Sequence, residues 1–185
     1  MTSRHESAPA WAYEPVRVVE PDPRWPALAQ RYAREVDALL GDRLAGPVLH
    51  VGSTAVPGLP AKPIIDLQAV ATEPAQVVVE AREALSSAHW HVVPRELDQR
   101  PWRWFVVRSD DCAKHRLAHL HLMTVGEPRW HEQIAFRDRL RASEELAREY
   151  ARLKASAAAR HGDDREAYAR AKFDFVHRVL GPRHG

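Results

Sequence analysis

The stretch His50-Val51-Gly52-Ser53-Thr54, followed after a short loop by Lys62-Pro63-Ile64-Ile65-Asp66, decides the fold that we expect for this chain. The mostly apolar residues over 47–51 predict a short strand, which Gly52-Ser53-Thr54 ends. After a loop rich in proline and glycine, a second apolar run over 64–70 predicts a central strand. The sequence therefore predicts two strands, the first ending in a glycine-serine turn and the second carrying Asp66.

The sequence around this stretch switches between helical and strand-like periods. Upstream, apolar residues recur at helical spacing from Trp25 to Leu40, and Gly41 ends that helix. Downstream, the patterns predict a helix over 74–88, strands over 90–93, 104–108 and 118–125, and helices over 129–141, 143–160 and 164–180. This order predicts an α+β fold with helices packed against one face of a mixed sheet.

The length of 185 residues fits one domain with its own core. We expect a flexible tail over residues 1–15 and a single domain over 16–183, with a helical C-terminal part over about 128–181. The N-terminus lacks the apolar core of a signal peptide, and no window reaches the roughly 18 apolar residues of a membrane helix. We therefore expect no association with a membrane.

The charge balance limits the class of partner. The chain has 27 basic and 25 acidic side chains, a formal net charge of +2, whereas a general nucleic-acid-binding surface needs a dominant basic excess. Cys112 is the only cysteine, so no intrachain disulfide forms, and a reducing cytoplasm is the simplest interpretation. We expect a cytoplasmic protein without general nucleic-acid binding.

Gly52-Ser53 and Asp66 are the first candidate site residues. A glycine at a strand end lets backbone amides approach a ligand, and the Ser53 hydroxyl can donate to a phosphate. The alternative is an ordinary turn. Asp66 strengthens the functional interpretation, because a carboxylate in an apolar strand is costly unless it is paired or metal-bound. A satisfied structural aspartate is its alternative, and strand alternation places Gln68 on the same face.

His119-Leu120-His121 is the second candidate cluster, and His115 lies close to it in the sequence. Residues two apart share one face of a strand, so both imidazoles point the same way. Two imidazoles near a carboxylate are suitable metal ligands. The alternative is a pair of histidines at a solvated edge of the sheet.

Several motifs together resemble the GrpB family. They are His50–Leu59, Ala61–Asp66, His119–Leu122, Trp130, Phe136–Arg141, Tyr150–Lys154, and Tyr168 with Lys172. The resemblance covers about residues 17 to 181 and implies a nucleotidyltransferase-like mixed β-sheet with helices packed on it. In some actinobacteria a related domain follows dephospho-CoA kinase, but this chain has no P-loop, so the kinase activity does not carry over.

The resemblance also implies a site. In the nucleotidyltransferase superfamily, a strand-end Gly-Ser holds the triphosphate, and an Asp-x-Asp/Glu pair with a third carboxylate binds two Mg²⁺ ions. Gly52, Ser53 and Asp66 match this pattern, and Thr54 follows directly. The second carboxylate is absent, because glutamine stands at position 68.

This departure changes the metal that we expect. Mg²⁺ prefers hard oxygen ligands, so one aspartate and a neutral amide would hold two such ions poorly. Asp66 with His50, His119 and His121 better suits a single Zn²⁺, Mn²⁺, Ni²⁺ or Fe²⁺ ion. We expect a mononuclear metal site that positions phosphates, with Mg²⁺ or Mn²⁺ if the protein is a working nucleotidyltransferase.

Basic residues complete the predicted site. Lys62 precedes the second strand, and Arg137 and Lys172 lie in helices of the C-terminal part. Together they predict a clamp for a nucleotide or another phosphorylated small molecule. The alternative is a set of long stems over a helix–sheet interface, which is the interpretation we favour for Lys154. Arg137 is alternatively paired with Asp138.

Most of the tryptophans follow strand or helix periodicity, which favours core packing over a base-stacking platform. Trp90, Trp104 and Trp130 belong to this group. Trp102 is the exception, because Asp98–Pro101 is typical of an exposed hairpin loop that could border the cleft.

The leading functional hypothesis is transfer of a nucleotidyl group, or related phosphate chemistry, onto a small-molecule acceptor. Ser53 and Lys62 bind phosphates, Asp66 binds the metal, and His119 or His121 completes the coordination or acts as general base. A non-catalytic ligand-binding or accessory domain is the second hypothesis, favoured by the missing second carboxylate. A mononuclear metal-dependent enzyme of another class is the third.

Overall fold

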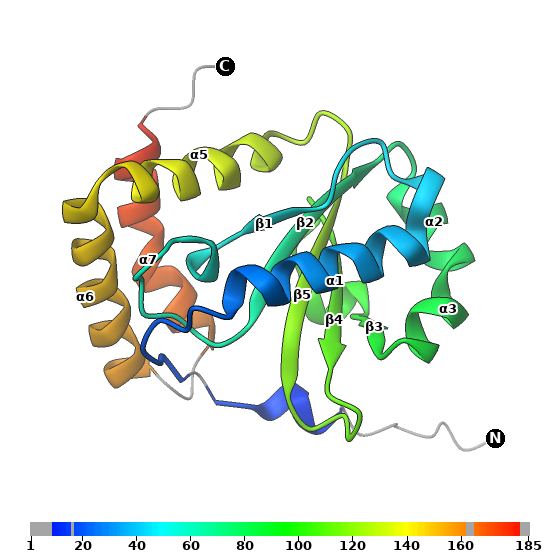
Figure 1. Cartoon of the computed structure of the whole chain (residues 1–185), viewed down its shortest axis with the longest axis horizontal. Helices are drawn as coiled ribbons and strands as arrows, with labels where there is room; N and C mark the ends of the chain where they lie inside the picture. The colour runs from blue at the N-terminus through cyan, green and yellow to red at the C-terminus, as the bar shows by residue number, and fades with distance from the viewer. Residues whose placement is uncertain (1–8, 16, 162–164, 182–185) are drawn as a thin grey trace.

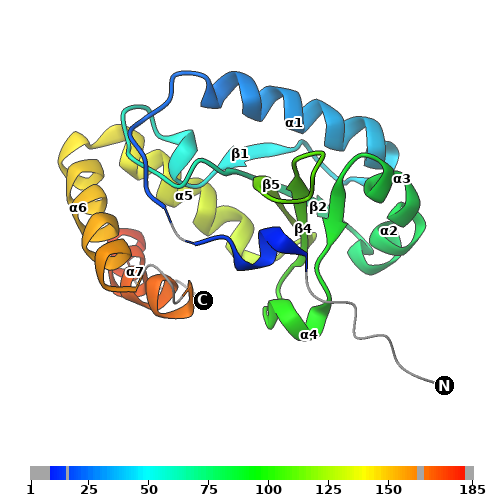
Figure 2. The same cartoon turned by 90° about the horizontal axis from the view of Figure 1, so that it is seen from below.

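A computed structural model describes residues 9–15, 17–161 and 165–181 of the chain. Over these residues a five-stranded sheet has the order β1-β2-β5-β4-β3 (Figure 1). β2 and β5 pair parallel, and all other neighbours in the sheet pair antiparallel. The predicted mixed sheet with helices packed on it is confirmed, but the helices lie on both faces rather than one (Figure 2).

Every strand lies within two residues of a predicted run. The strands are β1 (Leu49–Val51), β2 (Ile65–Ala71), β3 (Trp90–Val92), β4 (Trp104–Ser109) and β5 (Arg116–Thr124). β2 is an interior strand, as predicted, although the middle position in the sheet belongs to β5.

Over the described residues the α-helices follow the predicted periods, except the short helix over 95–98, which the sequence patterns do not predict. They are α1 (Trp25–Leu40), α2 (Pro74–Glu80), α3 (Arg82–Ser87), α4 (Arg95–Asp98), α5 (Pro128–Ala142), α6 (Glu144–His161) and α7 (Arg165–Leu180), with short 3-10 helices η1 (Ala10–Tyr13), η2 (Gly41–Arg43) and η3 (Ser53–Ala55). The helix predicted over 74–88 is split at Ala81, whose backbone leaves helical geometry with ψ of 2°. Among the described residues, no helix is long and apolar enough to cross a membrane.

One face of the sheet is apolar and forms the main core. Leu67 of β2 and Leu120 of β5 are fully buried there, together with Tyr32 and Val36 of α1. Trp90 is fully buried in the same cluster, as predicted, and its ring meets Tyr32 edge-on at 6.3 Å. Since side chains alternate along a strand, the residues between these apolar positions must point to the opposite face.

The opposite face of the sheet is polar at its centre. The parallel register pairs Asp66 with His119 and Gln68 with His121, so four polar side chains lie together on this face. α5 covers part of it, and Gln68 Nε2 donates to the backbone carbonyl of Trp130 at 3.1 Å. Figure 2 shows α1 along one face of the sheet and α5 on the other.

A second apolar cluster fixes the loop between β1 and β2 to the C-terminal helices. Val56 and Leu59 of this loop pack with Leu140, Tyr150 and Phe175, all of them buried. The rings of Tyr150 and Phe175 stack at 5.0 Å. This packing holds α6 and α7 beside the glycine-serine turn that precedes the loop.

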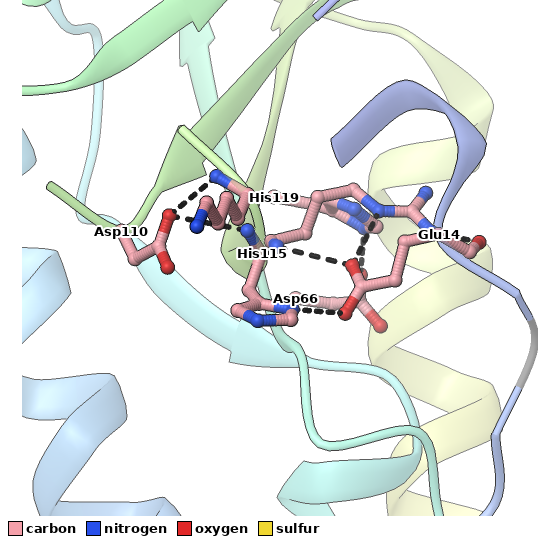
Figure 3. Close-up of polar contacts among 7 residues, drawn as sticks. Glu14, Asp66, Asp110, His115 and His119 are labelled. Atoms are coloured by element: carbon pink, nitrogen blue, oxygen red, sulfur yellow. Dashed lines mark hydrogen bonds and ion pairs between the residues drawn. The ribbon is translucent and has the colours of Figure 1, made fainter. Parts of the chain in front are cut away.

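The segment before α1 packs against the sheet over its described residues, whereas the sequence predicts a flexible tail over 1–15. Trp11 of η1 is buried, and its ring stacks on His91 at 6.1 Å. Glu14 accepts from the Arg116 backbone at 3.1 Å and lies 3.2 Å from His115 Nδ1 (Figure 3). Burial of the large Trp11 ring favours this docked arrangement. Residues 1–8 lie outside the described part of the chain.

Candidate functional site

A cavity of about 200 Å³ lies beside the polar face of the sheet. Its lining comes from η3, the loop before β2, the strands β2 and β5, and the helices α6 and α7. The lining residues are Ser53, Thr54, Lys62, Ile64, Asp66, His119, Lys154 and Lys172. The structure thus brings most of the sequence-predicted site residues together and adds Ile64 and Lys154.

Asp66 and His119 form the polar centre of the cavity. His119 Nδ1 lies 3.0 Å from Asp66 Oδ1 (Figure 3). Burial acts to raise the pKa of Asp66, but the hydrogen bond from His119 and the nearby His121 outweigh it, so the pKa is lowered. Because Asp66 is a carboxylate, His119 Nδ1 carries the proton and donates. His119 Nε2 is then a lone-pair nitrogen, buried without a hydrogen-bond partner among the described residues.

In His121 the protonated and the lone-pair nitrogen are exchanged relative to His119. Its Nδ1 lies 2.5 Å from Arg103 Nη1, and its Nε2 lies 3.8 Å from Asp66 Oδ1. A guanidinium can only donate, so Nδ1 accepts and Nε2 carries the proton. Burial and the charge of Arg103 lower the pKa of His121 to about 4, so the ring is neutral near pH 7.

Arg103, which donates to His121, is itself held by a buried ion pair with Asp98. Arg103 donates to both carboxylate oxygens of Asp98, at 3.0 Å from Nε and 2.5 Å from Nη2. The two side chains are 7% and 4% exposed. The prediction of an exposed hairpin loop over Asp98–Pro101 is wrong at Asp98, which is the last residue of α4 and is buried. Its carboxylate can be buried because it is paired with the Arg103 guanidinium. Trp102 stacks on His121 with ring centroids 5.9 Å apart.

Gly52 lies directly against Asp66. Its φ of +72° belongs to the left-handed region that glycine adopts without strain. A Cβ atom added at this position would lie 2.5 Å from Asp66 Oδ2. Glycine is therefore required here both by the backbone angle and by the close approach of the carboxylate.

Four sequence-predicted site residues do not line the cavity: Gly52 and His121, described above, and His50 and Arg137. His50 Nε2 lies 2.9 Å from Thr54 Oγ1, and the β1–β2 register places Val51, not His50, opposite Asp66. Burial lowers the pKa of His50 to about 4. Arg137 donates to the His50 carbonyl at 2.9 Å and to Asp138 at 2.7 Å. These contacts fix β1 to α5. The pairing with Asp138 is the alternative that we give for Arg137 in place of a ligand clamp.

The four predicted metal ligands are not arranged as a metal site. No group of three or more His, Cys, Asp or Glu side chains among the described residues is placed to hold an ion. His50 is bonded to Thr54, and His121 Nδ1 is bonded to Arg103. Within the described part of the chain, only Asp66 offers a carboxylate to the cavity. This donor set does not fit two Mg²⁺ ions, which require several hard oxygen ligands.

Lysine side chains instead provide most of the charge in the cavity. Lys154, for which we favour a long stem over a helix–sheet interface rather than a site role, is 2% exposed, lines the cavity and donates to the Pro60 carbonyl. Burial and the nearby Lys172 lower the pKa of Lys154 to about 7, and burial lowers that of Lys172 to about 8. Lys154 Nζ lies 4.9 Å from the centroid of the Tyr150 ring. The spacing of four residues, which puts both side chains on one helix face, could have indicated this contact. The side chain of Tyr168, in the matching pair with Lys172, lies outside the described residues.

The sheet, its flanking helices and the strand-borne Asp66 define a nucleotidyltransferase-like fold. A crystal structure of the Cid1 poly(U) polymerase with Mg 3'-dATP bound has this fold: the TM-score is 0.57 over 83% of this chain and 49% of that one. The two sequences are 11% identical, so the likeness is one of fold. The sequence of the chain matches the GrpB protein family over residues 15–181, and the chain belongs to that family.

Individual relatives agree with this assignment. The crystal structure of the conserved protein GrpB from Enterococcus faecalis has a TM-score of 0.76 and 25% identity, over 89% of this chain and 94% of that one. A UPF0157 protein from Pseudomonas aeruginosa is 38% identical over 90% of this chain. The dephospho-CoA kinase of Mycolicibacterium paratuberculosis is 33% identical over 87% of it. The chain spans 66% of the Pseudomonas protein, just under two thirds, and 44% of the kinase.

Proposed function

We propose that this nucleotidyltransferase-like protein binds the phosphates of a nucleotide, or of another phosphorylated small molecule, in the cavity beside Asp66, and transfers the phosphorus-containing group to an acceptor. The observation that carries this proposal is the composition of the cavity: two hydroxyl side chains and three lysines surround one carboxylate and one imidazole. Lysines and hydroxyls are common phosphate-binding groups.

Ser53 and the three lysines of the cavity have different roles in binding the phosphates. Ser53 follows a glycine at the end of β1 and offers a hydroxyl, whereas the Thr54 hydroxyl is already within 2.9 Å of His50. Lys62, Lys154 and Lys172 enter from three different segments and surround a bound phosphate with positive charge. In this proposal Ser53 and the lysines position the ligand, and Gly52 keeps Asp66 close to the turn.

His119 is the candidate general base. Asp66 accepts its Nδ1 proton and leaves a lone pair on Nε2. Because Nε2 is buried, ligand binding must open access to it before it takes a proton from an acceptor hydroxyl. The acceptor oxygen then forms a bond to the phosphorus, and the bond from phosphorus to the departing phosphate or pyrophosphate oxygen breaks. His121 does not share this role, because its Nδ1 accepts from Arg103. It acts as a positioning residue for Asp66.

A divalent metal ion stays a prediction from the sequence. The described side chains offer it Asp66 and no second carboxylate in the cavity.

Thermal unfolding with nucleoside triphosphates, each with EDTA or with Mg²⁺, Mn²⁺ or Zn²⁺, tests the proposal. We expect at least one nucleotide to raise the melting temperature. Release of phosphate or pyrophosphate in the presence of small-molecule acceptors then tests catalysis, and Asp66→Asn should abolish it without unfolding the domain. Absence of stabilisation by every phosphorylated ligand would contradict the proposal.

A non-catalytic accessory role is the second candidate. Gln68, which donates to Trp130 where a second carboxylate is expected, favours it. The similarity to part of a dephospho-CoA kinase also favours it, because that protein contains a second region beyond this match. Nucleotide binding without turnover in the wild type, with His119→Ala leaving the affinity unchanged, would support the accessory role over catalysis.

A further inference from the structure

Lysine is rare in this chain, and its distribution is uneven. The sequence has 27 basic side chains, of which only four are lysines, at positions 62, 114, 154 and 172. Arginine supplies the rest, including the ion pairs at Arg103 and Arg108. Three of the four lysines line the same cavity. In an arginine-rich chain, this concentration indicates that the cavity specifically uses compact ammonium groups.

Among the described residues that line the cavity, the lysines outnumber the acids. Asp66 is the only carboxylate in this described set, and His119 is held toward its neutral form because burial lowers its pKa. Lys154 is almost fully buried, and the lowered pKa values of Lys154 and Lys172 reflect burial, with the charge of Lys172 also acting on Lys154. An anion placed between them would relieve this repulsion, since opposite charges favour the ionised form of each ammonium.

The same charges work against a divalent cation at this position. A second positive ion beside two lysines is repelled, and one carboxylate gives it few hard ligands. We propose that Lys154 and Lys172 supply the positive charge that metal ions supply in a two-metal site, so that the cavity binds pyrophosphate or a nucleotide's polyphosphate without a divalent ion. This inference rests on the proposed function and specifies how its ligand is held.

The size of the cavity fits the phosphate part of such a ligand. Its volume of about 200 Å³ is below the roughly 300–1,000 Å³ of sites that enclose a drug-sized molecule. A pyrophosphate group is small enough to fit inside, whereas the sugar and base of a nucleotide would lie outside. Inorganic pyrophosphate is therefore the sharpest probe, because it tests this cavity without help from other contacts.

Isothermal titration calorimetry of the full chain with pyrophosphate and with ATP, in EDTA and in Mg²⁺, tests the inference. We expect saturable binding in EDTA, weakening as salt screens the charges, and no gain on adding Mg²⁺. Binding that requires Mg²⁺ would overturn the inference and leave the proposed function standing. If neither ligand binds under any condition, both fail.

Lysine-to-methionine variants test whether pyrophosphate affinity depends on the cavity lysines or only on the overall positive charge of the protein. Lys172→Met and Lys154→Met should each weaken pyrophosphate binding in EDTA by roughly tenfold to a hundredfold. Lys114→Met is the matched control, because Lys114 does not line the cavity, and its affinity should equal that of the wild type. Unchanged affinity in Lys172→Met, with the fold intact by circular dichroism, would overturn the inference even if Lys154→Met fails to fold.

Asp66→Asn should have opposite effects on a site that binds pyrophosphate without a metal ion and on a site that binds it through one. Asparagine keeps an acceptor for His119 Nδ1 and removes the only negative charge among the described residues of the cavity lining. Without a metal ion, pyrophosphate affinity in EDTA should be equal or higher in this variant. A large loss of affinity in a folded Asp66→Asn protein would show that the carboxylate holds the ligand through a metal ion, and the inference would be wrong.

Discussion

A Cβ atom on Gly52 would lie 2.5 Å from Oδ2 of Asp66, so the two chain segments that decide the fold meet at one contact. Gly52 has φ of +72° and precedes the serine of the turn. Asp66 extends toward it from β2 and keeps 32% of its side chain exposed. The glycine thus determines where the carboxylate can lie relative to the cavity.

Gly52→Ala should destabilise the protein and displace Asp66. A backbone with φ of +72° and ψ of −169° is essentially restricted to glycine and costs alanine about 1–3 kcal/mol, and the clash with the carboxylate adds to it. Gly58→Ala is the control, because Gly58 has φ of +73° but an added Cβ meets nothing within 4 Å. Urea denaturation should show the larger loss at Gly52. Equal losses in the two variants would mean that the contact with Asp66 carries no energetic weight.

The buried pair of Asp98 and Arg103 should matter more for stability than an exposed pair. Arg103→Met leaves the Asp98 carboxylate buried without its guanidinium, which costs roughly 3–5 kcal/mol. Arg148→Met removes a pair with Glu144 whose side chains are 63% and 81% exposed, and the loss should be below about 1 kcal/mol. Denaturant midpoints of the two variants measure this difference. A comparable small loss in both would contradict the assigned burial of Asp98.

Stability should rise with pH above neutrality because of Lys154. Its pKa is about 7 in the folded protein against 10.5 in the reference state, so the unfolded chain binds more protons between these values. Unfolding free energy therefore increases with pH over that window, by up to roughly 1.4 kcal/mol per pH unit. Lys154→Met should flatten the rise, leaving the part from Lys172. An identical pH dependence in Lys154→Met and wild type would disprove the lowered pKa.

The elements of the fold could be predicted because their signals are local. The strands β1 and β2 follow from short apolar runs bounded by proline and glycine, and α1 follows from its apolar stripe. The docking of Trp11 and the burial of Asp98 were missed for the opposite reason. Each depends on a contact that local patterns do not reveal: Trp11 packs on His91, which is far away in the sequence, and Asp98 pairs with Arg103 across a turn.

The site could be predicted only in part. The motifs indicate Ser53 and Asp66, but the pairing of Asp66 with His119 depends on the parallel register of β2 and β5, which joins residues 53 positions apart. Lys154 shows why charge is hard to place from sequence. A lysine on an amphipathic helix has the same spacing whether its stem reaches water or a buried cavity.

The two site histidines should be opposite tautomers near neutral pH. Asp66 accepts from Nδ1 of His119, whereas Nδ1 of His121 accepts from Arg103. Ring ¹⁵N chemical shifts distinguish a protonated from a lone-pair nitrogen, and His119→Gln and His121→Gln variants assign the signals. We expect Nδ1–H for His119 and Nε2–H for His121.

Arg103→Met tests whether this difference is imposed by the guanidinium. Without its donor, Nδ1 of His121 can take the proton, so the His121 signals should shift while those of His119 stay unchanged. The pKa of His121, lowered to about 4 by burial and then by Arg103, should rise in this variant. If both imidazoles instead have the same tautomer in the wild type, the lone pair assigned to His119 Nε2 is unsupported, and with it the choice of His119 as the base.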